Sequence, residues 1–86
     1  MAYKILYKKS VYRDLKKLGS AEARKLLSKL EKELSKKAAS YPVLKGQFAG
    51  LRKYRFSVYR VIYALLDEEV IVLRIGHRKE IYKKET

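Results

Sequence analysis

The sequence of 86 residues contains no cysteine and no tryptophan, and it has only one histidine and one proline. The absence of cysteine excludes a disulfide framework, a thiolate zinc site and a cysteine nucleophile, and it suits a reducing compartment such as the cytoplasm. One histidine among scattered acids offers few ligands for a protein-only metal site, so we expect no metal and no cofactor.

Long hydrophobic runs are also absent. No apolar stretch approaches the roughly 20 residues that cross a bilayer, and no apolar segment of a signal peptide follows Met1. We therefore expect no membrane span and a cytoplasmic location. A chain of this length is too short to bury two separate cores, which predicts one domain over residues 1–86.

Positive charge is abundant. The chain carries 22 Lys and Arg against 9 Asp and Glu, a formal net charge of +13 with a pI of about 10.0. Such an excess on a small domain is typical of a protein that binds a polyanion, with nucleic acid the first candidate. Two alternatives are a solvated lysine-rich surface without a partner, and an anionic membrane surface contacted by a basic amphipathic helix.

The first half of the chain has the pattern of a strand followed by two helices. Residues Ala2–Tyr7 alternate as a strand does, and Ser10 offers a helix N-cap that Gly19 would end. A second helix is expected from Ser20 to just before Tyr41-Pro42. Its apolar stripe recurs at helical spacing, at Ala23, Leu27, Leu30, Leu34 and Ala38.

The second half changes to a period of two. Residues Val43–Gly50 indicate a loop or an irregular edge, and three β-rich runs follow, at Leu51–Phe56, Tyr59–Leu66 and Val70–Gly76. The turns between these runs are so short that the strands must form an antiparallel meander. The sequence thus predicts an α+β fold, with an N-terminal strand, a two-helix hairpin packed on one face of the sheet, and the meander.

Basic residues near the strand ends form the candidate site. Alternation places Lys53 and Arg55 on one face of their strand, and Arg60 lies just across a tight turn. His77 and Arg78 leave the sheet at the end of the last strand. We expect these five side chains to form one patch that suits a phosphodiester, because guanidinium groups match phosphate oxygens and stabilise added negative charge. A nearby histidine transfers protons close to neutral pH.

Each of these residues also has a structural interpretation. Arg60 could pair with Asp67 or Glu68 on the surface, where such ion pairs are weak. Arg74 lies inside an apolar strand, and we expect it to pair with an acid such as Glu80. Taken one at a time, each of these residues is better explained by a structural role. The five basic or titratable residues together are better explained as a functional site.

Several segments together resemble the RelE/ParE superfamily of toxins from toxin–antitoxin systems. The matching stretches are Leu44–Gly46, the strand Tyr59–Tyr63 (YRVIY), and the ending Val72–Tyr82 (VLRIGHRKEIY). The resemblance covers essentially the whole chain, and the ending looks more like the RelE branch. It implies a toxin of a type II toxin–antitoxin system that enters the ribosomal A site and cuts mRNA there. The implied cut uses the ribose 2′-OH, leaves a 2′,3′-cyclic phosphate and needs no metal.

The resemblance also implies roles for individual residues. Arg60 falls at the family's phosphate-binding arginine, and Lys53 resembles a family lysine that acts as a base or binds phosphate. Arg55 would steady the phosphate, and Arg78 resembles the arginine after the last strand. The remaining two are His77, where some relatives use a histidine in proton transfer, and Tyr82, which resembles the tyrosine of the family's ending.

The sequence departs from the best-known branch in two places. Leu51 stands where that branch has a further lysine, and the spacing from Arg78 to Tyr82 is shorter. The implied partners are a cognate antitoxin, the ribosome and mRNA, with no membrane. Two other functions stay open: a DNA gyrase inhibitor of the ParE type without nuclease activity, and an RNA-binding module that does not cleave.

Overall fold

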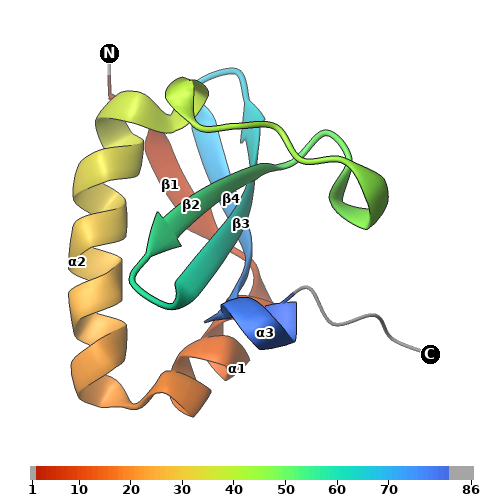
Figure 1. Cartoon of the computed structure of the whole chain (residues 1–86). Coiled ribbons are helices and arrows are strands. Elements are labelled where there is room, and N and C mark those ends of the chain that lie inside the picture. Colours follow the sequence, from red (N-terminus) through yellow and green to blue (C-terminus); the bar gives the residue numbers. More distant parts are fainter. Residues whose placement is uncertain (1, 82–86) are drawn as a thin grey trace.

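The computed structural model describes residues 2–81, apart from the side chain of Gln47, and these residues form a sheet with two long helices on one face (Figure 1). The predicted α+β fold, a strand, a helical hairpin and an antiparallel meander, is confirmed. The elements in chain order are β1 (Lys4–Tyr7), α1 (Lys9–Leu18), α2 (Ser20–Lys37), two 3₁₀ turns (Ala38–Ser40 and Gly46–Phe48), β2 (Arg52–Phe56), β3 (Tyr59–Leu66), β4 (Glu69–His77) and α3 (Arg78–Ile81).

The strands lie in the order β1-β4-β3-β2, so the first and last strands are neighbours. β1 pairs with β4 in parallel, from Lys4 opposite Glu69 to Tyr7 opposite Val72. β2, β3 and β4 pair antiparallel, with a register shift between Ile62 and Tyr63. The parallel pair requires a long crossover, and the helical hairpin supplies it.

The main core lies between α2 and the sheet. Leu26, Leu30, Leu34 and Ala38 are fully buried, and they form an i, i+4 row along α2 and into the 3₁₀ turn that follows it. This corrects the predicted stripe, because Leu27 and Ala23 are only half-buried. The row through Leu26 is the one that faces the sheet, whose buried members are Tyr54, Val61, Tyr63, Val70, Val72 and Ile75.

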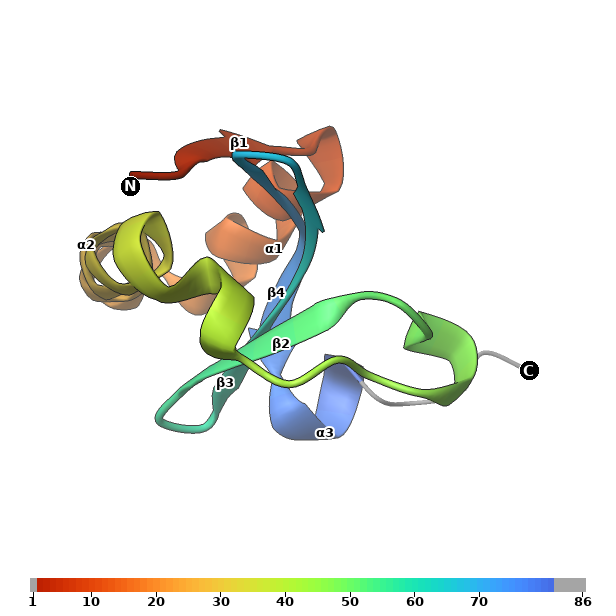
Figure 2. The same ribbon diagram turned by 90° about the horizontal axis from the view of Figure 1, so that it is seen from above.

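The other face of the sheet is only partly covered. Figure 2 shows α1 and α2 on one side of the sheet and α3 on the other. Ile62 and Ile81 are buried but lie outside the main core cluster, and a Cβ added to Gly76 would come 3.5 Å from Ile81 Cδ1. α3 therefore covers one end of this second face, which explains why β3 and β4 are apolar on both sides.

The helix starts differ from the sequence prediction. α1 begins at Lys9, and the Ser10 hydroxyl donates to Leu73 O at 2.8 Å instead of capping the helix. Gly19 does separate the helices, with a φ of 89° that favours glycine, and Ser20 is the first residue of α2 without a side-chain cap. Within residues 2–81 no helix combines the length and the apolar character that a membrane span needs.

Two buried tyrosines make the fold sensitive to alkaline pH. Desolvation, with smaller contributions from Tyr41 and Glu33, raises the pKa of Tyr54 to about 12, and the ring packs edge to face on Tyr41. Desolvation also raises the pKa of Tyr63, whose hydroxyl donates to Ala38 O at 2.6 Å. Unfolded tyrosines ionise near pH 10, so above that pH the unfolded chain loses protons that the folded chain keeps.

We expect the free energy of unfolding to fall as pH rises from about 10 to about 12, by up to about 1.4 kcal/mol per pH unit for each such tyrosine. Urea unfolding at pH 9 and pH 11 measures this loss. Tyr54→Phe should show a smaller loss than the wild type, whereas Tyr12→Phe, at an exposed position, should not. An equal loss in Tyr54→Phe and the wild type would contradict the expectation.

Candidate functional site

The edge of β4 beyond β1 is covered by α1. β1 pairs with β4 only as far as Val72, which leaves the following backbone groups without a strand partner on that side. The backbone N–H of Lys8, just before α1, donates to Val72 O. Two side chains of α1 supply the next partners: the Ser10 hydroxyl donates to Leu73 O, and the Ile75 N–H donates to Asp14 Oδ2 at 2.9 Å. Side chains of α1 thus replace a strand where β4 approaches its end.

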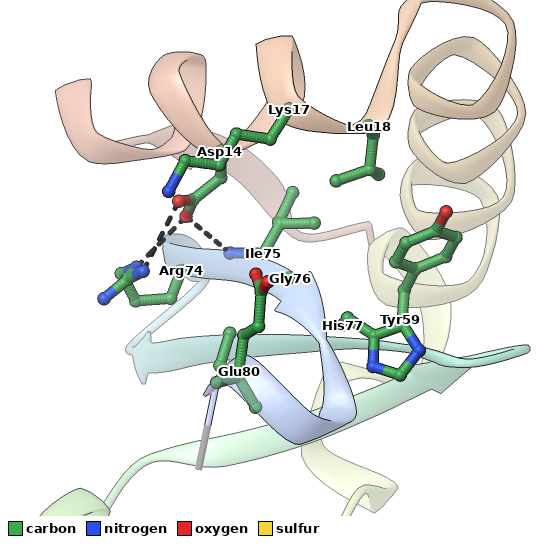
Figure 3. Close-up of a pocket in the computed structure, with 10 residues that line it drawn as sticks. Asp14, Lys17, Leu18, Tyr59, Arg74, Ile75, Gly76, His77 and Glu80 are labelled. Carbon is green, nitrogen blue, oxygen red and sulfur yellow. Dashed lines mark hydrogen bonds and ion pairs between the residues drawn. The ribbon is translucent and has the colours of Figure 1, made fainter. Parts of the chain in front are cut away.

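Asp14 also holds the side chain of Arg74. Arg74 Nε lies 3.1 Å from Asp14 Oδ2, and Nη2 lies 3.4 Å from Oδ1 (Figure 3). Asp14 is buried, whereas the Arg74 side chain is 48% exposed. The structural role expected of Arg74 is present, but its partner is Asp14 and not Glu80, because α1 brings its carboxylate to the edge of β4.

Three of the predicted site residues share the face of the sheet that α1 and α2 leave uncovered. Arg55 lies opposite Arg60, which in turn lies opposite Gly76, and Lys53 lies two residues earlier on the same face. Arg60 is 7% exposed, and its Nη1 donates to Ser57 O and Tyr59 O. The alternative pairing of Arg60 with Asp67 or Glu68 is wrong, since that turn joins the opposite end of β3 to β4.

Arg78 lies beside this cluster. Its backbone N–H donates to Val58 O at 2.9 Å, which fixes the start of α3 against the β2–β3 turn, and its side chain is exposed. Arg55, Arg60 and Arg78 therefore surround one turn, and we call these three residues the arginine cluster. Guanidinium groups so placed suit a phosphate, with which they form paired hydrogen bonds.

His77 lies on the opposite face from the arginine cluster. Its register partner is Tyr59, and the two rings meet edge to face with centroids 6.3 Å apart. His77 Nδ1 accepts the N–H of Lys79 at 3.2 Å, so the neutral ring carries its proton on Nε2. The single patch expected from the sequence is thus divided between two faces. Tyr82 lies outside the described residues.

A pocket of about 260 Å³ opens between α1, β4 and α3, on the side of His77 (Figure 3). We call it the α1–β4 pocket; its lining consists of Asp14, Lys17, Leu18, Tyr59, Arg74, Ile75, Gly76, His77, Glu80 and Ile81. Sequence reasoning missed Asp14 and Lys17, and it named Glu80 only as a partner of Arg74. Only Asp14 gave a signal, because it interrupts the apolar face that Val11, Leu15 and Leu18 form on one helix.

A second, open hollow of about 710 Å³ lies along α2. Phe56 and Ala21 contribute apolar surface to it, and basic side chains line it at Arg24, Lys25, Lys29 and Lys32. An apolar surface bordered by cations fits an acidic, amphipathic partner.

Comparisons with known proteins identify relatives over nearly the whole length. The model of a family described as the ParE toxin of type II toxin–antitoxin systems (parDE) matches residues 5–82. A chain of the RelBE2 toxin–antitoxin complex from Mycobacterium tuberculosis is 26% identical, with a TM-score of 0.81 over 91% of this chain and 100% of that one. No curated protein sequence matches the chain.

Two further solved structures represent both branches of this fold. A mutant of the E. coli toxin RelE in the free state is 25% identical, with a TM-score of 0.72 over 95% of this chain and 88% of that one. A chain of the chromosomal ParDE system of P. aeruginosa is 16% identical, with a TM-score of 0.67 over 88% of this chain and 96% of that one, and it shares the fold alone. RelE-like and ParE-like proteins therefore have this architecture in common, and the fold does not separate them.

Removing the carboxylate of Asp14 should destabilise the fold. Asp14→Ala leaves the Ile75 N–H without its acceptor, and we expect a loss of about 2–3 kcal/mol in the free energy of unfolding. Asp14→Asn keeps an acceptor oxygen and should lose less. Arg74→Ala should cost at most about 1 kcal/mol, because the ion pair is half-exposed.

Urea unfolding of the three variants gives these losses, and hydrogen exchange of the Ile75 amide reports the bond directly. Equal losses for Asp14→Ala and Arg74→Ala would show that the ion pair, and not the amide bond, is what matters at this edge.

Proposed function

Because the chain belongs to the RelE/ParE superfamily of type II toxin–antitoxin toxins, we propose that it is a ribosome-dependent endoribonuclease that cleaves mRNA in the A site and so inhibits translation. The observation that carries the proposal is the arginine cluster, Arg55, Arg60 and Arg78 around one turn. A toxin that acts by binding a protein does not require three guanidinium groups there. The net charge of +13 suits a polyanionic ribosomal cleft, with strongly salt-dependent binding.

The proposed reaction is a transesterification within the RNA strand. The ribose 2′-OH attacks the neighbouring phosphorus, the bond from phosphorus to the 5′-oxygen breaks, and a 2′,3′-cyclic phosphate forms. A base takes the proton of the 2′-OH, and the departing 5′-oxygen receives a proton. Negative charge accumulates on the phosphate oxygens in the transition state, and fixed guanidinium groups stabilise it without a metal.

We assign phosphate binding and proton transfer to individual residues according to their positions. Arg60 and Arg55 hold the scissile phosphate, and Arg78, exposed at the start of α3, contacts it from the other side of the turn. Lys53 shares their face and is the candidate base or a further phosphate ligand. The proton-transfer role of His77 stays a prediction, and its place on the opposite face argues against it. The role of Tyr82 also stays a prediction.

We further propose a cognate antitoxin as the regular partner. The similar chain from M. tuberculosis comes from a toxin–antitoxin complex, which supports a partner of this kind. The hollow along α2, apolar at Phe56 and lined by three lysines and Arg24, suits an acidic amphipathic segment of that partner.

The second candidate function is inhibition of DNA gyrase without cleavage of RNA. The matching family model, which is named for ParE, favours it. Labelled precursors added after induction of the toxin distinguish the two functions. Incorporation of amino acids should stop first if the protein cleaves mRNA, whereas DNA damage signalling should come first if it inhibits gyrase.

Arg78→Ala tests the proposed site with little risk to the fold, since the side chain is exposed. We expect cleavage of mRNA on programmed ribosomes to slow by about 10²–10³-fold, as when one group that stabilises a transition-state oxyanion is removed. Thermal unfolding should be unchanged.

Lys36→Ala is the matched control. It removes one exposed positive charge near the end of α2, where Ser35 O accepts the Tyr3 N–H and the sheet begins, far from the β2–β3 turn. It should cleave at nearly the wild-type rate. If Arg78→Ala cleaved as fast as Lys36→Ala, the arginine cluster would not be the catalytic site.

A further inference from the structure

We propose that the α1–β4 pocket binds one nucleobase of the RNA strand whose phosphate the arginine cluster holds. The inference rests on the proposed nuclease function and adds to it a subsite for a base. It concerns the edge of β4 between α1 and α3, to which the proposed chemistry assigns no step.

The size of the pocket suits a small planar group. Its volume is about 260 Å³, whereas sites for drug-sized ligands begin at about 300 Å³. α1, β3, β4 and α3 each contribute to the lining, and Figure 3 shows Tyr59 and His77 together on one side of it, with Asp14 and Arg74 on the other. A single base fits such a space better than a longer ligand.

The charge balance of the pocket favours a neutral ligand. Its lining holds two cations, Lys17 and Arg74, and two carboxylates, Asp14 and Glu80. Asp14 and Arg74 already neutralise each other. In a protein with a net charge of +13, this balance is unusual for a surface that would take phosphate. An uncharged base suits the pocket, and the phosphates suit the arginines nearby.

The aromatic side of the pocket offers a stacking surface. The Tyr59 and His77 rings are nearly perpendicular, at 82°, and both side chains are only half-buried. Single-stranded RNA is commonly recognised by stacking its unpaired bases on tyrosine and histidine rings. The Tyr59 ring has no other task in the proposed cleavage.

The polar groups of the pocket can read the edge of a base. The Glu80 carboxylate makes no hydrogen bond or ion pair within residues 2–81, and it can only accept. It therefore favours a base with an exocyclic amino group, as in the contact of a carboxylate with the amino group of cytosine. His77 offers a donor, because Lys79 already occupies Nδ1 and the proton of the neutral ring lies on Nε2.

Each of the two aromatic residues of the pocket is followed in the sequence by an arginine of the arginine cluster. Tyr59 precedes Arg60, and His77 precedes Arg78. Successive strand residues point to opposite faces, so a base beside Tyr59 and a phosphate beside Arg60 lie on two sides of the same sheet end. The bound strand would pass around that end with one base turned out of its stack, as in other enzymes that process nucleic acids.

Binding of uncleavable RNA tests the pocket without relying on catalysis. Short 2′-O-methyl oligonucleotides that differ only in one central cytosine or uracil are titrated with the free toxin, and fluorescence anisotropy gives the affinity. We expect the cytosine probe to bind about tenfold more tightly. Glu80→Ala should abolish this preference. Glu68→Ala removes the same charge at the β3–β4 turn, at the far end of the sheet, and should keep it.

A second variant and a direct measurement complete the test. Tyr59→Leu should weaken both probes about tenfold, because stacking tolerates either base. Amide NMR signals of Leu18 and Gly76 in the wild-type protein should shift when the cytosine probe is added, which locates the ligand even if Tyr59→Leu fails to fold. Equal affinity for the two probes, with no shift at Leu18 and Gly76, would overturn the inference.

The remaining outcomes separate this inference from the proposed function. A base preference that depends on Glu80, in a protein that does not cleave mRNA on ribosomes, would overturn the nuclease proposal and leave the pocket assignment intact. Normal cleavage with no base preference would overturn the pocket assignment alone. If Glu80→Ala and Tyr59→Leu weakened binding of the antitoxin but not of RNA, the pocket would be a protein contact and the inference would be wrong.

Discussion

The carboxylate of Asp14 lies where the parallel partner of β4 ends, and it accepts the N–H of Ile75 that no strand is there to receive. An uncovered strand edge invites pairing with other chains, and a helix with one buried acid closes this edge instead. The same contact joins α1 to the last residues of β4. The positions of Gly76, His77 and Arg78 follow from it, because they are the next residues along the strand.

The two helices of the hairpin therefore contact one face and one edge of the sheet by different means. α2 packs leucines against the buried face, whereas α1 offers polar groups to a backbone edge. The first kind of contact depends on apolar area and tolerates exchange of similar side chains, but the second depends on one carboxylate in one position. The end of β4 and the pocket beside it are thus more sensitive to a single residue than the core is.

Local patterns in the sequence were sufficient for the elements and for the meander. Periods of four and two residues separate the helices from the strands, and turns as short as Ser57-Val58 leave no other pairing for β2 and β3. The parallel pairing of β1 with β4 was not predicted, because it joins residues about 65 positions apart and no local pattern records it. The prediction placed Leu27 in the core, whereas Leu26 is buried there. The sequence alone does not fix how a helix is rotated about its axis, because that rotation depends on the sheet it packs against.

The candidate site was predicted in part for the same reasons. Arg55 and Arg60 came together because a tight turn fixes their register. His77 was expected beside them, but its alternation along β4 sends it to the other face with Tyr59. Asp14 was overlooked because an acid on an apolar helix face acquires its meaning only from the amide that it meets.

The order of the strands also has a consequence for the time at which this protein can become active. β4 contacts both β1 and β3, and it is the last of the four to be synthesised. A nascent chain can form its helical hairpin early, but the sheet cannot close until residue 77 has emerged, because non-local pairings form late. The ribosome that makes this chain therefore translates all four strands before a folded toxin exists.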